Sequence, residues 1–110
     1  MDSTELLAFL AAVGHEQRIR IINELADGQL YVSELARRLG VSRPLLYMHL
    51  ERLEKAGLVT GNLALSEDGK ALKYFELAPF DVQLNVAAIT AAVRQDPAGT
   101  PGQHSDKGTP

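Results

Sequence analysis

The chain has 110 residues, 45% of them apolar, which is room for one small domain with an aliphatic core. It contains no cysteine, which excludes disulfides, thiolate metal sites and thiol redox centres built from these residues. The formal net charge of −3 is unfavourable for nucleic-acid binding, but the acidic excess lies at the two ends, and residues 15–77 carry equal numbers of acids and bases. Neither a signal peptide nor a membrane-spanning stretch is recognisable, so we expect a cytoplasmic protein.

Two helices and a short strand are predicted first. Residues 4–13 form the first helix, with Ser3 or Thr4 as its cap and several apolar side chains. Residues 16–26 form the second, with Ile19, Ile22 and Leu25 on one face. Residues 30–32 are too few for more than a brief strand.

Two further helices are joined by a tight turn. Ser33 is expected to cap the first of them, which ends at Gly40 because glycine tolerates a left-handed backbone. Ser42 is expected to cap the second, with Pro44 in its first turn and the end near residue 56. The inward positions of the two helices are Leu35, Ala36, Leu39, Leu46, Leu50 and Leu53.

The pattern then changes to strands. Apolar runs at 58–65 and 72–77 flank an Asp-Gly turn, which predicts a β-hairpin. A fifth helix is predicted over 81–94, and the Pro-, Gly-, Ser- and Thr-rich residues 96–110 predict a disordered tail. This order predicts a helix-turn-helix followed by a hairpin. The same shape serves both DNA binding and protein–protein interaction, so spacing alone leaves both open.

The resemblance to one family is more specific. The segments GHEQRIRIINEL (14–25), SELARRLGVSRPLLYMHLERLEKAGLV (33–59) and LSEDGKALKYFEL (65–77) resemble the ArsR/SmtB family of winged-helix repressors. The resemblance implies a mostly α fold with a hairpin wing and five helices, a homodimer, a pseudo-palindromic DNA operator and regulation by a ligand. Residues 1–95 would form the winged helix-turn-helix domain, with dimerisation helices at both ends.

The second helix of the motif is the expected DNA-reading element. Arg43 matches the family's pattern and suits guanine, whereas Leu45 and Met48 replace polar residues and suit thymine methyls. Glu51 stands where family members usually carry a basic residue. The expected DNA-binding residues are Arg38, Ser42, Arg43, Leu45, Tyr47, Met48, Arg52 and Lys70. The expected dimer residues are Leu6, Leu10, Val82, Val86, Ile89 and Val93.

The family's usual metal ligands are largely missing. Tyr31 and Ser33 stand where some members carry cysteines, and Asp81 matches a ligand of the last helix but lacks its histidine companions. His15, His49 and His104 show no shared spacing and are expected to be unrelated packing or surface residues. We therefore expect no metal, no cofactor and no enzymatic activity.

Two hypotheses remain: a dimeric regulator that binds double-stranded operator DNA, and an interaction module whose exposed Leu45, Tyr47 and Met48 dock a protein. A hybrid of the two is a DNA-binding subunit whose effector is sensed by a separate partner protein.

Overall fold

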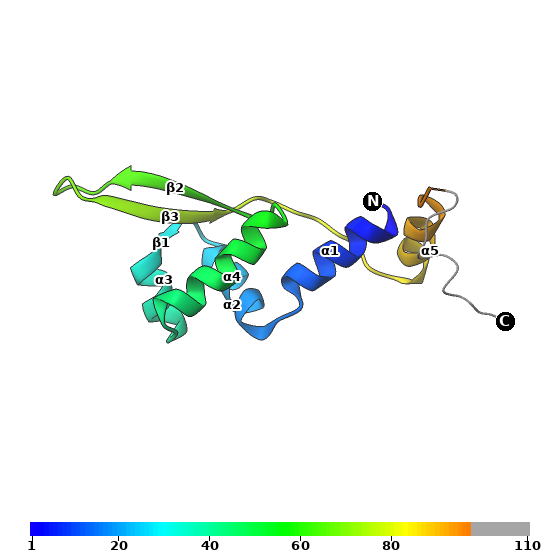
Figure 1. Cartoon of the computed structure of the whole chain (residues 1–110), viewed down its shortest axis with the longest axis horizontal. Coiled ribbons are helices and arrows are strands. Elements are labelled where there is room, and N and C mark those ends of the chain that lie inside the picture. The colour runs from blue at the N-terminus through cyan, green and yellow to red at the C-terminus, as the bar shows by residue number, and fades with distance from the viewer. Residues whose placement is uncertain (98–110) are drawn as a thin grey trace. The chain divides into compact units, whose positions relative to one another are not determined.

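The computed structural model describes residues 1–97, which fall into two units (Figure 1). One unit contains Phe9–Asp81, and the other contains Met1–Ala8 together with the chain from Val82 onward. Helix α1 (Ser3–Val13) runs from one unit into the other. The expected disordered tail lies outside the described residues except for its first two positions. Of these, Asp96 accepts hydrogen bonds from the backbone N–H (2.9 Å) and hydroxyl (2.5 Å) of Ser3.

The larger unit has the predicted order of elements. Its sheet is antiparallel with strand order β1-β3-β2, so β3 lies between its hairpin partner β2 and the short edge strand β1. Val59 pairs with Leu77 at one end of the hairpin and Leu65 with Ala71 at the other. The elements are α2 (Glu16–Leu25), β1 (Leu30–Tyr31), α3 (Val32–Leu39), α4 (Arg43–Lys55), β2 (Val59–Leu65) and β3 (Ala71–Leu77).

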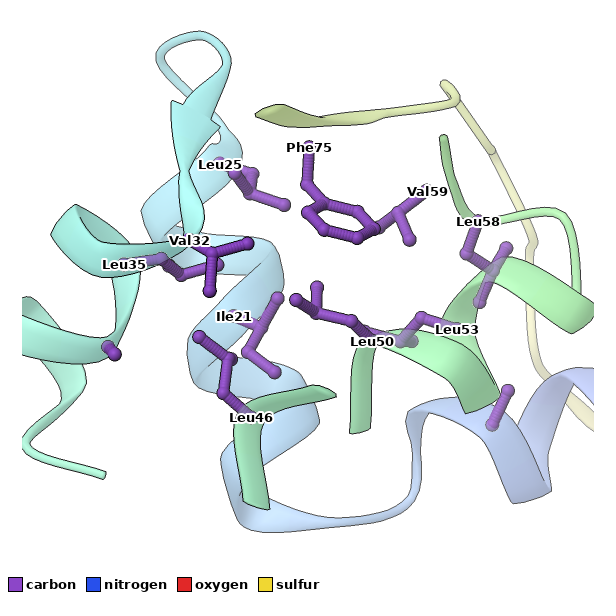
Figure 2. Close-up of a cluster of buried hydrophobic side chains, with 12 residues drawn as sticks. Ile21, Leu25, Val32, Leu35, Leu46, Leu50, Leu53, Leu58, Val59 and Phe75 are labelled. Carbon is purple, nitrogen blue, oxygen red and sulfur yellow. The ribbon is translucent and has the colours of Figure 1, made fainter. Parts of the chain in front are cut away.

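The core of this unit lies between the helices and the end of the hairpin where Val59 pairs with Leu77, which we call the root of the hairpin (Figure 2). The predicted stripe of α4 is confirmed, because Leu46, Leu50 and Leu53 are completely or almost completely buried. Phe75 is the aromatic ring of this core, and a side chain at Gly61 would place its Cβ 2.8 Å from that ring. Each such buried side chain stabilises the fold by roughly 1.5–3 kcal/mol relative to exposure.

Two details of the predicted helices were wrong. Ile19 is 58% exposed, and α2 instead buries Arg18, Ile21 and Leu25. The inward face follows the spacing i, i+3, i+7, and it places an arginine in the core. Helix α3 begins at Val32 rather than after a Ser33 cap, because Val32 is itself a core residue and its cap position, Tyr31, belongs to β1.

The last helix is shorter than predicted. Helix α5 covers Val86–Arg94 and begins at Asn85, whose side chain accepts the N–H of Ala88 at 2.8 Å. The Asn85 cap is itself extended, so the helix cannot begin before it. The prediction that Val82 belongs to the apolar stripe of this helix was therefore wrong. No helix within the described residues is long and apolar enough to span a bilayer.

Candidate DNA-binding surface

The turn between α3 and α4 is closed by backbone hydrogen bonds. Gly40 has φ 67°, and Val41 donates its N–H to the carbonyl of Ala36 at 3.2 Å. Gly40 itself donates to Arg37 at 3.3 Å, which completes the Schellman arrangement that ends many helices. Val41 packs against the core, so the turn also fixes the distance between the two helices. The predicted role of Gly40 is confirmed.

Helix α4 begins with the predicted cap. The Ser42 hydroxyl accepts the N–H of Leu45 at 3.3 Å, and Pro44 lies in the first turn. Pro44 has no N–H and that of Leu45 is already bound, so this helix start has few free amides for a phosphate. Phosphate binding here therefore depends more on side chains than on the backbone.

The outward face of α4 carries the predicted side chains. Leu45, Tyr47 and Met48 are each about two-fifths exposed (41%, 43% and 41%), and Arg43 and Arg52 are exposed as well. Large apolar side chains at such exposure are free to contact another molecule. This face therefore combines two guanidinium groups with an apolar centre.

An open hollow of about 350 Å³ lies between the start of α4 and the hairpin. Arg43 and Tyr47 line it from α4, and Lys73 lines it from β3. Ser33 and Tyr31 add two hydroxyl groups from the start of α3 and from β1. Two cations and three hydroxyl groups around one hollow suit an anion such as a backbone phosphate. Lys73 was not among the expected DNA-binding residues, and this grouping was missed because it depends on how the hairpin packs.

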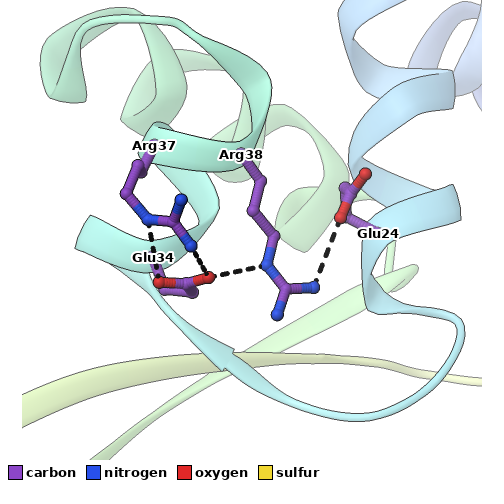
Figure 3. Close-up of polar contacts among 4 residues, drawn as sticks. All are labelled: Glu24, Glu34, Arg37 and Arg38. Atoms are coloured by element: carbon purple, nitrogen blue, oxygen red, sulfur yellow. Dashed lines mark hydrogen bonds and ion pairs between the residues drawn. The ribbon is translucent and has the colours of Figure 1, made fainter.

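Arg38, an expected phosphate contact, is held by two carboxylates (Figure 3). Its Nε donates to Glu34 at 2.8 Å and its Nη1 to Glu24 at 3.5 Å. Arg37 also donates to Glu34 through Nε at 3.2 Å and through Nη2. The hydrogen bonds from Arg37 and Arg38 lower the pKa of Glu34, and the bond to Glu34 raises the pKa of Arg38. The positive charge expected here is therefore largely neutralised. The sequence signal for the two ion pairs of Glu34 was its spacing, three and four residues before Arg37 and Arg38.

Lys70 lies at the tip of the hairpin, next to acidic residues. Its backbone N–H donates to the Ser66 hydroxyl at 3.1 Å. Asp68 binds the same hydroxyl, and this hydrogen bond lowers the pKa of its carboxyl, which keeps the carboxyl charged. With Glu67 beside it, the tip offers one cation among carboxylates, a weak arrangement for phosphate.

A polar contact that the sequence analysis missed lies behind α4. Arg18 Nη1 lies 3.1 Å from Nδ1 of the buried His49, and the rings of His49 and His15 are 4.5 Å apart between centroids. His49 is a packing residue and His15 a surface residue, which agrees with the expectation, but the contact between their rings was not predicted, and His104 lies outside the described residues. His49 is three residues from Leu46 and four from Leu53, so the helical period already placed it inward.

Comparison with known proteins identifies the family of this motif. A family model described as bacterial regulatory protein, arsR family, matches residues 15–60, which span α2 to the start of β2. The HTH-type transcriptional regulator MJ0229 of Methanocaldococcus jannaschii, itself uncharacterized, is 35% identical over 69 residues, which cover 63% of this chain and 72% of that protein. This chain belongs to the ArsR family.

Other ArsR-type regulators share the sequence and the fold. The transcriptional activator HlyU of Vibrio cholerae is 38% identical over 58 residues, which cover 53% of this chain and 54% of HlyU. This sequence match therefore spans about half the length of HlyU. Its structure superposes with a TM-score of 0.57 and 27% identity over 82% of this chain and 86% of that chain. The repressor BigR of Xylella fastidiosa, at 20% identity and a TM-score of 0.60, supports the fold alone.

The family match leaves α1 and α5, the expected dimerisation helices, outside its residues. Leu6 is buried within the chain, and Leu10 is half-buried, so α1 has less free apolar surface than expected. Val86, Ile89 and Val93 of α5 are exposed. In residues 1–97 no three His, Cys, Asp or Glu side chains group closely enough to hold a metal ion. Asp81, the residue that matched a family ligand, precedes α5 and is not part of it.

Proposed function

We propose that this ArsR-family chain is a dimeric, cytoplasmic transcriptional regulator that reads double-stranded operator DNA with α4 and the hairpin. The observation that carries this proposal is the division of α4 into two faces. One face is buried in the core by three leucines, and the other exposes Arg43 beside the hollow. A helix held in this way enters a major groove with its first turns at the base edges.

Arg43 is the proposed base-reading residue. Among the described residues it has no ion-pair partner, unlike Arg38, so its guanidinium is available for bidentate bonds to guanine. Lys73 and Tyr47 would then hold the neighbouring phosphate in the hollow. Leu45 and Met48 would contact thymine methyl groups, and Arg52 the backbone. Ser42 acts mainly as a helix cap, and Lys70 adds little.

The proposed dimer places two recognition helices on one operator. The exposed apolar residues of α5, Val86, Ile89 and Val93, form the core of the interface in this proposal. Two-fold symmetry would make the contact self-complementary and set the helices about one DNA turn apart. This spacing matches a pseudo-palindromic operator.

The proposal includes no catalytic step and no resident metal. Family members respond to ligands, and the usual metal-ligand residues are replaced here by Tyr31, Ser33 and Gln83. We therefore propose that a separate protein senses the effector and alters DNA binding through contact with this chain. Purified protein is expected to bind zinc or nickel no more tightly than micromolar, which calorimetry measures.

A second candidate function has one specific observation in its favour. Leu45, Tyr47 and Met48 on α4, together with Leu63 and Leu65 on β2, are exposed apolar side chains on the same unit. Such a surface suits a protein partner better than a phosphate backbone. Under this alternative, DNA affinity would be weak and independent of sequence.

The test compares two duplexes over a range of salt concentrations. One is the DNA upstream of the protein's own coding sequence, and the other has the same base composition in scrambled order. The proposal predicts tighter binding to the first, with affinity that falls steeply as salt rises. Equal, weak binding to both would favour the interaction module instead.

A further inference from the structure

Arg18 and His49 form a buried polar contact between α2 and α4. Arg18 is 8% exposed and His49 is 2% exposed, and they are the polar residues of the described core. The contact joins Nη1 of Arg18 to Nδ1 of His49 at 3.1 Å. A guanidinium can only donate hydrogen bonds, so Nδ1 of His49 accepts and its ring proton lies on Nε2. This assignment requires a neutral His49.

The charged groups around His49 are all basic. Arg18 faces it from α2, His15 lies at the N-terminus of α2 with its ring 4.5 Å away, and Arg52 follows it on α4. Among the described residues, no carboxylate lies within ion-pair distance of Arg18 or of either histidine. Nε of Arg18 is buried without a hydrogen-bond partner. His49 therefore accepts a hydrogen bond from a buried cation that has no carboxylate partner among the described residues.

We propose that Arg18 and His49 are positioning residues that hold the recognition helix on α2, and that they do so only while His49 is neutral. The inference rests on the proposed function for its effect on DNA. Protonation turns Nδ1 into a donor that faces another donor and adds a charge beside a buried guanidinium. The hydrogen bond is then lost, and α4 separates from its support next to Leu46 and Leu50.

The direction of the pH effect follows from the surroundings of His49. Burial, followed by the charges of His15, Arg18 and Arg52, lowers the pKa of His49 below its ordinary value. A histidine whose pKa is lowered by folding makes its full contribution to the free energy of unfolding above the ordinary histidine pKa of about 6.5. That contribution decreases as the pH falls towards the lowered pKa. DNA affinity should therefore fall in acid, although added positive charge by itself would strengthen binding to phosphates.

Two substitutions at the same position separate this contact from general effects of pH. His49→Asn places an amide oxygen where Nδ1 lies, so it accepts from Arg18 and does not titrate. His49→Phe fills the space without an acceptor. We expect wild-type affinity for the upstream duplex to fall between pH 8 and pH 5, because protonation of His49 removes the hydrogen bond from Arg18. His49→Asn should bind like the wild type at pH 8 and lose most of this fall, whereas His49→Phe should bind weakly throughout.

The matched control is His15→Gln, which removes the neighbouring exposed ring. It should raise the pKa of His49 and move the fall in affinity to higher pH, because one nearby positive charge is gone. A His49→Asn protein that loses affinity in acid as the wild type does would overturn the proposal. Circular dichroism on each variant separates loss of α4 positioning from loss of the fold.

A measurement without DNA keeps the inference separate from the proposed function. Nitrogen-15 NMR of the histidine rings in the free protein reports which nitrogen carries the proton and where each ring titrates. The proposal expects a proton on Nε2 of His49 and a midpoint below that of an exposed histidine. A proton on Nδ1, or a midpoint at the ordinary value, would overturn it. Absence of DNA binding at every pH, with the expected NMR result, would overturn only the role on DNA.

Discussion

Helices α4 and α5 both carry an apolar stripe, but the chain covers only one of them. In α4 the stripe of Leu46, Leu50 and Leu53 is buried in the core of the larger unit. In α5, by contrast, Val86, Ile89 and Val93 are 80%, 46% and 52% exposed. The same sequence pattern therefore has two outcomes among the described residues: it is buried within the unit in α4 and exposed in α5, where we propose that a second copy covers it.

The surroundings of each helix explain the difference. Helix α4 lies among α2, α3 and the root of the hairpin, which together enclose its inner face. Among the described residues, the unit that contains α5 otherwise has Met1–Ala8 and the short stretches 82–85 and 95–97, and in it Leu6 and Ala92 are the buried apolar side chains. The exposed stripe of α5 is the observation on which the proposed dimer depends.

The largest effect is expected at the exposed stripe. Ile89→Glu would bury an uncompensated carboxylate in the proposed dimer interface, at a cost of roughly 3–5 kcal/mol per unpaired charge. We expect monomers by sedimentation and loss of operator binding in the same variant. The matched control is Thr90→Glu, a neighbouring position outside the apolar stripe. A variant that stays dimeric would remove α5 from the interface.

The next effect concerns the face of α2 that sequence reading misassigned. Ile21→Ala should lower the free energy of unfolding by about 2–5 kcal/mol, because Ile21 is completely buried. Ile19→Ala, two residues away on the same helix, should change it by no more than about 0.5 kcal/mol. Urea unfolding of both variants measures the difference. Equal losses would contradict the inward face of α2.

A smaller effect is expected from Arg43. Arg43→Ala should cost about 1–3 kcal/mol of binding to the specific duplex and less on the scrambled one, because it removes a base contact. Arg20→Ala is the matched control, since Arg20 is an exposed arginine of α2 that pairs with Glu16 at 2.9 Å. Fluorescence anisotropy on both duplexes measures the change. Equal losses on the two would assign Arg43 to the backbone instead.

The smallest effect concerns the carboxylates that hold Arg37 and Arg38. Glu34→Gln should remove the charge partner of Arg37 and one of the two carboxylates that hold Arg38, and raise affinity for the scrambled duplex a few-fold at low salt, with little change in sequence preference. Glu16→Gln, which frees only Arg20, is the control. Unchanged binding in Glu34→Gln would mean that α3 lies away from the DNA.

The helix-turn-helix could be predicted because local chemistry determines it. Gly40, Ser42 and Pro44 each have one favoured place at a helix end, and the structure uses each of them there. The leucine stripe of α4 was equally clear. The end of the last predicted helix was recovered as well, while its beginning was misplaced because the Asn85 cap was not recognised.

The site was harder to predict because it depends on contacts between distant residues. Arg38 pairs with Glu24, and His49 contacts Arg18 and His15, through packing between helices that sequence spacing does not contain. Arg18 had no predicted structural role, and each histidine was expected to be a packing or surface residue. The hollow beside Arg43 likewise required the position of the hairpin.

The central claim is that two copies of this chain bind one operator. Sedimentation velocity of the full chain at tens of micromolar, alone and with the labelled upstream duplex, tests it most directly. The account predicts a dimer without DNA and a complex of two chains per duplex with it. A monomer in both samples, or one chain per duplex, would contradict the two-half-site mechanism.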